Sequence, residues 1–354
     1  MREDFQYYLH HICGCTQKQK YLLAVSGGID SVVMAWLFKY SELQFSIAHC
    51  NFHLRNEESD GDQIFVEDLA QKLKVRCYIT HFETLDFARS KGYSIQMAAR
   101  ELRYKWFEEL RSSLGMDFIA TAHNQDDMVE TLLINLTRGT GIRGLTGIKP
   151  RYGKIIRPLL FAERDSIMAF AKEMGIRWRT DSSNLNNKYQ RNVIRNSIIP
   201  EFIQRFPAFR HNVLNTIQNL EQTNELMNWT MDKIKNEIKI EDNTRSLIDI
   251  QKLKQLPAVE TVLFELLREY GINASMAHSL NEMISGRPGK RIYTHTHTIT
   301  RDRQYLIINK YKKNTTEVNE MLITSEMTEI MHPIKLHFSF LRGDLDGYPV
   351  FIWK

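Results

Sequence analysis

The sequence predicts an α/β fold in which a parallel sheet with helices on both faces is followed by a mainly helical domain and a short C-terminal segment. Strand-like and helix-like segments alternate over roughly the first 135 residues, a pattern typical of parallel sheets. A glycine loop joins the first strand to the first helix, and from residue 209 apolar residues recur at steps of three and four. We therefore expect an α/β domain at 1–208, a mainly helical domain at 209–312 and a last segment at 313–354.

The elements of the first domain follow from local pattern. An apolar run at 21–25 is a strand, 26–31 is a tight loop, and the apolar residues after it begin a helix. Further strands are expected at 45–50, 75–80 and 118–121, and further helices at 58–74, 95–114 and 125–136. Ligands of such sheets bind at the carboxyl ends of the strands, where Ser26, His49 and His123 fall.

The second domain begins with a long amphipathic helix from residue 209 to 238. Helical patterns continue at 259–270 and 276–284. A turn at 286–289 then leads to strand-like segments at 292–300 and 305–309.

Composition narrows the class of protein. Hydrophobic residues make up 43% of the 354, enough for ordinary cores. No apolar stretch approaches the ~20 residues that span a membrane, and the N-terminus has no signal-peptide pattern. The four cysteines form no Cys-x-x-Cys pair, which argues against a zinc or iron–sulfur site and fits a reducing, cytoplasmic location.

Positive charge is concentrated in one stretch. Residues 138–195 hold 13 Lys and Arg against 4 Asp and Glu, whereas the whole chain carries only +5. A basic segment in a near-neutral chain favours a polyanionic partner, although charge on a solvated face would give the same pattern.

The glycine loop has the features of a phosphate site. It consists of Ser26, Gly27, Gly28, Ile29, Asp30 and Ser31. Adjacent glycines let the backbone approach an anion, and the next helix offers unpaired N–H groups. Asp30 would repel phosphate unless Mg²⁺ lay between them. The Gly-Lys-Ser/Thr ending of a Walker A loop is missing, which argues against a γ-phosphate transferase. The alternative is a glycine turn that Asp and Ser merely cap.

Several motifs in register over residues 21–200 together resemble one family, the tRNA(Ile)-lysidine synthetases of the PP-loop (N-type) ATP pyrophosphatases. They are SGGIDS at 26–31, HCNFHLR at 49–55, ARELRY at 99–104, TAHNQDDMVET at 121–131, LTRGTGIRGL at 136–145, RPLL at 157–160, TDSSN at 180–184 and RNVIR at 191–195. The resemblance implies that ATP adenylylates the wobble cytidine of a tRNA(Ile) with a CAU anticodon. Free L-lysine then displaces AMP to form lysidine.

The resemblance implies essential roles for Asp127 and Glu130, with Asp126 as a further catalytic candidate. Asp127 and Glu130 share a helix face, where they would hold Mg²⁺, bind the lysine ammonium or accept its proton. Metal binding is assigned to Asp30 and Asp127. Capping of the helix start is the alternative.

Basic side chains complete the predicted site. Arg100 and Arg103 lie one helical turn apart and suit phosphate, with Arg103 expected at the α-phosphate. His49 is expected to contact ATP. The expected tRNA contacts are Arg138 and Arg143 in a glycine-rich loop and Arg191 and Arg195 on one helix face. The alternative for Arg100, Arg103, Arg191 and Arg195 is a solvated position on a helix surface. The alternative for the glycine-rich loop is a flexible connector, and that for His49 is a buried, hydrogen-bonded histidine.

Two other functions stay open at this point: a PP-loop enzyme of tRNA thiolation, and a non-catalytic RNA-binding protein with a degenerate ATP site. Longer family members carry a further C-terminal domain, so 313–354 is interpreted as its truncated start, with a genuine terminal strand as the alternative. The sequence leaves the oligomeric state open, a homodimer included.

Overall fold

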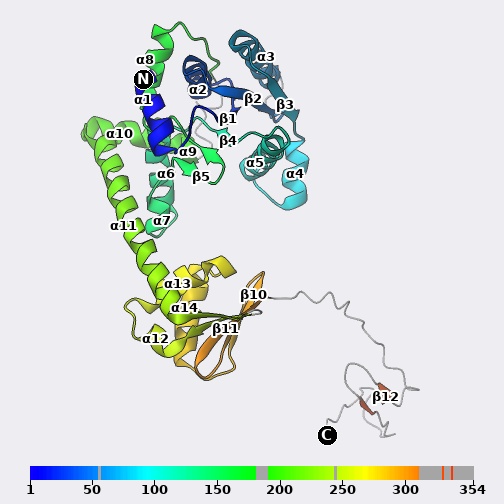
Figure 1. Cartoon of the computed structure of the whole chain (residues 1–354), viewed down its shortest axis with the longest axis vertical. Coiled ribbons are helices and arrows are strands. Elements are labelled where there is room, and N and C mark those ends of the chain that lie inside the picture. The colour runs from blue at the N-terminus through cyan, green and yellow to red at the C-terminus, as the bar shows by residue number, and fades with distance from the viewer. Residues whose placement is uncertain (55–56, 181–189, 243–244, 311–328, 331–335, 338–354) are drawn as a thin grey trace. The chain divides into compact units, whose positions relative to one another are not determined.

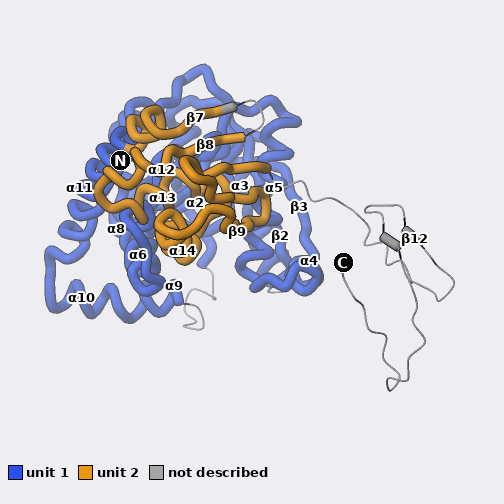
Figure 2. Tube along the Cα trace, turned by 90° about the horizontal axis from the view of Figure 1, so that it is seen from below, with its two compact units in different colours: residues 1–230 blue, residues 231–354 orange. Residues whose placement is uncertain are grey.

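The computed structural model of the chain describes residues 1–54, 57–180, 190–242 and 245–310, and two short strands beyond them (Figure 1). These strands are β12 (Glu329–Ile330) and β13 (Leu336–His337), which pair antiparallel. The rest of the predicted segment 313–354 lies outside the described residues. So do Arg55 and residues 181–184 of the predicted motifs. The chain divides into two compact units, residues 1–230 and 231–354, with the division inside helix α11 (Phe209–Ile238) (Figure 2).

The first unit is built around a six-stranded sheet in the order β3-β2-β1-β4-β6-β5. Neighbouring strands are parallel except for β5, which pairs antiparallel with β6. The strands are β1 (Lys20–Ala24), β2 (Gln44–Asn51), β3 (Cys77–His81), β4 (Phe118–Ala120), β5 (Arg151–Tyr152) and β6 (Ile155–Ile156). The predicted parallel sheet is confirmed.

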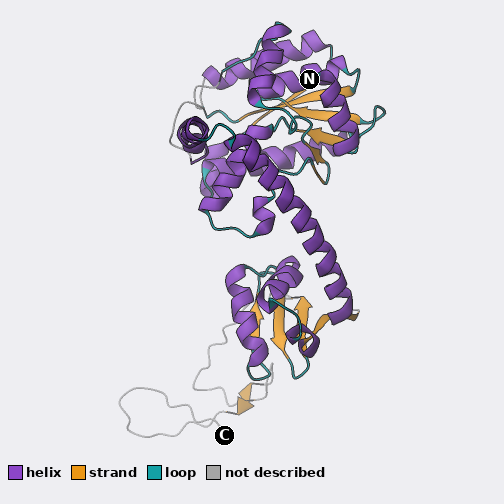
Figure 3. Ribbon diagram, turned by 90° about the vertical axis from the view of Figure 1, so that its left-hand side faces the viewer, coloured by secondary structure: helices purple, strands orange, loops and turns teal. Residues whose placement is uncertain are grey.

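Helices cover both faces of this sheet (Figure 3). The larger core lies on one face, where Tyr21 and Leu23 of β1 pack with α1 (Arg2–Tyr7), η1 (Tyr8–Ile12), α2 (Ile29–Tyr40), α3 (Glu57–Leu73) and α8 (Arg164–Glu173). On the other face Leu22 packs against Phe107 of α5 (Ile95–Ser113), and α4 (Thr84–Lys91) contacts α5. Burial from both faces explains why β1 is a continuous apolar run rather than an alternating one.

A smaller cluster joins the helices that follow β4. Val129 of α6 (Gln125–Thr137) packs with Ile194 and Ile199. These two belong to a helical run of α9 (Gln190–Val193), η3 (Ile194–Ile198) and α10 (Ile199–Arg205). The short helix α7 (Ile142–Leu145) follows α6. This packing fixes the start of α6 next to the helix that carries Arg191 and Arg195.

The second unit combines helices with a five-stranded antiparallel sheet in the order β7-β8-β11-β10-β9. The helices are α12 (Ile250–Lys254), α13 (Val259–Leu267), η4 (Arg268–Tyr270) and α14 (Ala274–Ser285). The strands are β7 (Lys239–Asp242), β8 (Arg245–Asp249), β9 (Arg291–Tyr293), β10 (His297–Arg301) and β11 (Tyr305–Lys310). The predicted strand at 292–300 is in fact two paired strands, and β7 and β8 escaped prediction because short, partly exposed strands carry little pattern.

No helix in the described part of the chain is long and apolar enough to cross a membrane.

Candidate active site

A cavity of about 500 Å³ opens at the carboxyl ends of β1, β2 and β4. Such an edge is where ligands bind in open parallel sheets. Residues of the glycine loop, of α5 and of α6 line it together, although they lie far apart in sequence. Its charged lining residues are Asp30, Asp62, Asp127, Arg100, Arg103, Arg164, Arg179, Arg191 and Arg195. With six arginines against three aspartates among the described lining residues, the cavity suits an anion.

The glycine loop forms the turn between β1 and α2. Gly27 has a φ of +92°, which a residue with a side chain rarely adopts. The Ser31 hydroxyl donates to the Gly28 carbonyl at 2.9 Å, and the Ser26 N–H donates to the Ser31 oxygen at 3.1 Å. No side chain caps the N-terminus of α2, so its first N–H groups are available to a phosphate.

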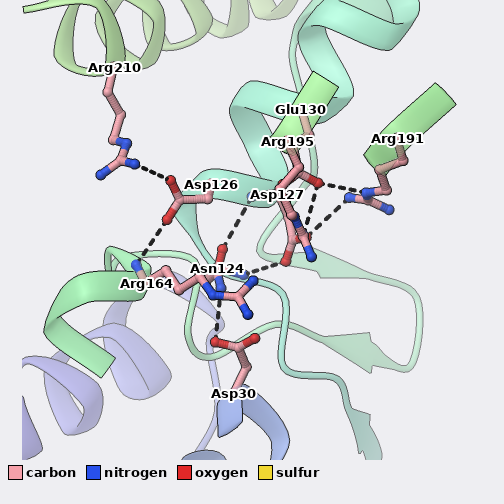
Figure 4. A network of polar contacts seen from close by, with 9 residues as sticks. All are labelled: Asp30, Asn124, Asp126, Asp127, Glu130, Arg164, Arg191, Arg195 and Arg210. Carbon is pink, nitrogen blue, oxygen red and sulfur yellow. Dashed lines mark hydrogen bonds and ion pairs between the residues drawn. The ribbon is translucent and has the colours of Figure 1, made fainter. Parts of the chain in front are cut away.

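Asp30 lies in the first turn of α2 and faces α6. Its carboxylate accepts a hydrogen bond from Asn124 Nδ2 at 3.1 Å (Figure 4). Burial raises the pKa of Asp30, and the charge of Asp127 raises it further, against the lowering effect of Arg164. The site therefore holds a carboxylate whose negative charge is only partly compensated.

The start of α6 is fixed by a capping box. Asn124 accepts from the Asp127 N–H at 3.2 Å, and Asp127 accepts from the Asn124 N–H at 3.0 Å. Asp127 lines the cavity, whereas Asp126 does not. Asp127 therefore both caps the helix and lines the cavity, so the capping role does not exclude the predicted role in catalysis.

Asp127 and Glu130 meet two arginines in a network of ion pairs (Figure 4). Arg191 Nε donates to Glu130 at 2.7 Å, and Arg195 donates to the same carboxylate at 2.5 and 3.0 Å. Both arginines also reach Asp127 Oδ1 at 3.2 Å. Burial alone would lower the pKa of Arg195. The hydrogen bond with Glu130 and the negative charges of Glu130, Asp127 and Asp30 together outweigh burial, so the pKa of Arg195 is raised.

Asp126 is turned toward another part of the unit. One carboxylate oxygen accepts from the backbone N–H of Arg164 at 2.9 Å, and the other pairs with Arg210 at 2.8 Å (Figure 4). Asp126 thereby ties the start of α6 to the first turn of α8 and to α11.

The two arginines of α5 line the cavity near aromatic rings. The Arg103 guanidinium lies 5.1 Å from the centre of the Phe52 ring, and that of Arg100 lies 4.8 Å from the Tyr104 ring. Stacking restrains the long side chains without neutralising their charge, which leaves both able to meet a phosphate.

Two of the histidines near the strand ends, His49 and His123, line the cavity, and His53 does not. His49 is buried, lines the cavity and donates from Nδ1 to the Val25 carbonyl at 2.9 Å, and burial lowers its pKa. His123 also lines the cavity, and burial lowers its pKa to about 4, so it is neutral at pH 7. His53 does not line the cavity; its ring lies 5.0 Å from that of His81.

The predicted tRNA-binding arginines fall into two groups. Arg191 and Arg195 line the cavity, as described. Arg138 is exposed and donates to Gln190 at 3.3 Å, and Arg143 donates to Asn228 of α11. Neither of these two lines the cavity.

Asp62, Trp178 and Arg179 line the cavity but were missed by the sequence analysis. The Arg179 N–H donates to the Gly27 carbonyl at 3.0 Å, and its guanidinium pairs with Asp62 of α3 at 2.5 Å. The partners are 117 residues apart in sequence, and no local pattern connects them.

The chemistry of the donors fits one Mg²⁺ bound jointly with phosphate. Asp30 and Asp127 both line the cavity beside the glycine loop. No group of three or more His, Cys, Asp or Glu gathers as a metal site among the described residues. Mg²⁺ commonly takes only one or two carboxylates and completes its shell with water and phosphate oxygens, so this donor set suits it.

Comparison with known proteins identifies the family. Residues 1–202 match the model of the PP-loop domain, and residues 241–311 match that of the TilS substrate binding domain. A tRNA(Ile)-lysidine synthase of Parabacteroides distasonis is 38% identical over 329 residues, which cover 93% of this chain and 74% of the relative. The chain belongs to the tRNA(Ile)-lysidine synthase family.

A second tRNA(Ile)-lysidine synthase, from Bacteroides thetaiotaomicron, is 41% identical and covers 82% of this chain and 67% of the relative. The predictions of the family, of the fold class and of an ATP-using enzyme of tRNA processing are confirmed, and thiolation is not favoured. Among solved structures, the U34-tRNA thiolase NcsA from Methanococcus maripaludis matches with a TM-score of 0.51 and 19% identity, covering 62% of this chain and 79% of that one. At this identity the likeness shows a shared fold alone.

Proposed function

We propose that the chain joins L-lysine to the wobble cytidine of tRNA(Ile) with a CAU anticodon, with ATP as the activating co-substrate. The supporting observation is a single cavity that combines a phosphate-binding loop, arginines and Asp127 of α6, and two of those arginines also pair with the buried Glu130 behind it. The family membership supplies the identity of the tRNA and of the product.

In the first step the triphosphate lies against residues 26–31 and the N-terminus of α2. The cytidine 2-carbonyl oxygen attacks the α-phosphorus, the bond to the β-phosphate oxygen breaks, and pyrophosphate leaves. Arg103, with Arg100 beside it, is positioned to stabilise the negative charge that grows on the α-phosphate. Mg²⁺ held by Asp30 and Asp127 would neutralise charge on the departing pyrophosphate.

In the second step the ε-amine of lysine attacks C2 of the activated cytidine, the C2–O bond breaks and AMP leaves. The amine must be neutral to attack. Asp127 and Glu130 are assigned to bind the ammonium form, and Asp127, which lines the cavity, to accept its proton.

The remaining predicted residues receive roles consistent with their places. Asp126 is assigned to position Arg164 and α6 rather than to touch substrate, because its carboxylate meets Arg164 and Arg210. Arg138 and Arg143, outside the cavity, are assigned to the tRNA backbone, and His49 to the nucleotide.

Thiolation has a specific difficulty in this chain. All four cysteines are free, and burial raises the pKa of Cys50 to about 12 and that of Cys77 to about 11. Their thiols are therefore protonated at neutral pH and poor nucleophiles.

The test is to incubate the chain with ATP, labelled lysine and a CAU-anticodon tRNA(Ile) transcript. We expect tRNA-dependent incorporation of label, with pyrophosphate and AMP as products and no requirement for a sulfur donor. Absence of incorporation alongside a sulfur requirement would replace the proposal with thiolation, and absence of pyrophosphate release with any amine would favour a non-catalytic RNA-binding role. Sedimentation of the pure chain tests for a homodimer, and fractionation of cells tests for the cytoplasmic location.

A further inference from the structure

The carboxylates assigned to the lysine ammonium already hold cations in this structure. Glu130 is 1% exposed and accepts hydrogen bonds from both Arg191 and Arg195. Asp127 Oδ1 lies 3.2 Å from a nitrogen of each. Two guanidiniums thus occupy the positions that an incoming ammonium needs (Figure 4).

The buried Glu130 carboxylate cannot lose both arginines before lysine arrives, because it would then have no counter-ion. Removing a counter-ion from a buried charge is costly because water does not replace it. Glu130 therefore keeps at least one cation at all times, and lysine binding has to be an exchange of one cation for another.

The arginines are better able to move than the carboxylates. The Arg191 side chain is 41% exposed and that of Arg195 is 26% exposed, against 1% for Glu130. Both line the cavity that holds the phosphate loop. A planar guanidinium binds phosphate oxygens as well as it binds a carboxylate, so a bound polyphosphate offers these arginines a second partner.

Resting on the proposed function, we propose that Arg191 and Arg195 mask the ammonium site in the free enzyme and release it when a phosphate group binds. Phosphate takes up one guanidinium, the carboxylate oxygens that it held become available, and the ammonium of lysine replaces the cation that left, while the other arginine stays on Glu130. The net charge around Glu130 stays balanced throughout. Phosphate and lysine therefore bind with positive coupling, and by linkage each tightens the other by the same factor.

A permanent structural ion pair is the contrasting case, in which the arginines stay on the carboxylates and only hold α6 to α9. The two cases predict opposite changes in lysine affinity when Arg191 is replaced. Removing Arg191 from a mask strengthens lysine binding in the absence of phosphate, whereas removing it from a scaffold weakens lysine binding in every state.

The experiment measures L-lysine binding to the full chain by calorimetry with no addition, with α,β-methylene ATP and Mg²⁺, and with the tRNA transcript. We expect the analogue to tighten lysine binding by about 5- to 50-fold. The tRNA arm shows whether backbone phosphate releases the mask as well as nucleotide phosphate does. In Arg191→Gln, which leaves Arg195 to pair with Glu130, lysine binds more tightly without nucleotide, and the effect of the analogue falls to about threefold or less.

Arg205→Gln is the matched control. It removes an arginine from an exposed pair with Glu201 on α10, at 3.1 Å and 69% exposed, outside the cavity, and is expected to leave both affinities unchanged. Arg191→Lys keeps the charge but loses the planar fork, and we expect intermediate coupling. A melting temperature close to that of the parent verifies folding of each variant.

Two results overturn the inference. If lysine affinity is the same with and without both phosphate ligands, and incorporation into tRNA is intact, the masking hypothesis is wrong and the proposed function is unaffected. Weaker lysine binding by folded Arg191→Gln in all states makes the arginine a scaffold. Lysine that binds in no state and is never incorporated removes the proposed function, and the mask with it.

Discussion

Replacing Asp30 by Asn separates the contribution of this residue to catalysis from its contribution to stability. The substituted side chain keeps an Oδ1 acceptor for Asn124 Nδ2, now 3.1 Å away, but loses the negative charge. Because burial raises the pKa of Asp30, its ionised form is disfavoured in the folded protein. In the proposed function this carboxylate would hold Mg²⁺ together with phosphate.

The sign of the stability effect follows from linkage. A carboxyl group whose pKa is raised on folding contributes stability below its unfolded pKa of about 3.9, and that contribution is lost as pH rises through the folded pKa. At pH 7, without Mg²⁺, we expect Asp30→Asn to be as stable as the parent or up to about 1 kcal/mol more stable. That advantage disappears near pH 3.

The effect on activity should be far larger. Loss of one group that stabilises charge in the transition state typically lowers turnover by about 100- to 1000-fold. The assays are urea unfolding in EDTA and lysine incorporation with ATP and Mg²⁺. Asp86→Asn, on the exposed face of α4 and outside the cavity, serves as the control. Turnover within about threefold of the parent, in a variant that binds tRNA normally, would refute the assignment of Asp30.

Further predictions concern thiols, packing and an imidazole. Cys50→Ala and Cys77→Ala each retain at least about half of the incorporation activity, because these half-buried thiols have raised pKa values and are protonated at neutral pH; loss of activity in either would restore the thiolation hypothesis. Gly144→Ala places a Cβ 2.0 Å from Thr140 Oγ1 and 2.9 Å from its Cβ, so we expect about 1–3 kcal/mol of destabilisation in urea and recovery when Thr140→Gly is added. Failure of the second substitution to restore stability would contradict the steric explanation. The pKa of His123 is lowered to about 4, so the parent loses stability relative to His123→Gln as pH falls from 6.5 toward 4, which paired thermal melts would show; parallel melting curves would contradict it.

The local elements of the first unit were predictable because each depends on neighbours in sequence. The strand–loop–helix at 20–40 and helices α3, α5 and α6 begin and end within a few residues of the predicted bounds. The Ser94 cap of α5 and the capping box of α6 show why: the signals that start these helices are local. In the second unit β7 and β8 were not predicted, because both strands are short and partly exposed and because β8 pairs with the distant strand β11.

The sequence predicted several of the residues that line the cavity, but not how their side chains pair. The sequence assigned Asp127 and Glu130 to one role and Arg191 and Arg195 to another. The fold places them in one network, across separations of 61 to 68 residues. The same holds for Asp62 and Arg179, whose contact spans 117 residues.

By itself the sequence determined the chemistry on offer: a phosphate loop without a Walker lysine, carboxylates at a helix start, and arginines in excess. Motif order also identified the family. Only the tertiary structure decided which cation lies against which carboxylate, that Asp126 faces Arg164 and Arg210, and that the cavity carries more arginines than aspartates. The physical reason is that the type of a charged side chain limits which ligands it can bind, whereas burial and distance, which depend on the packed fold, determine which ligand it does bind.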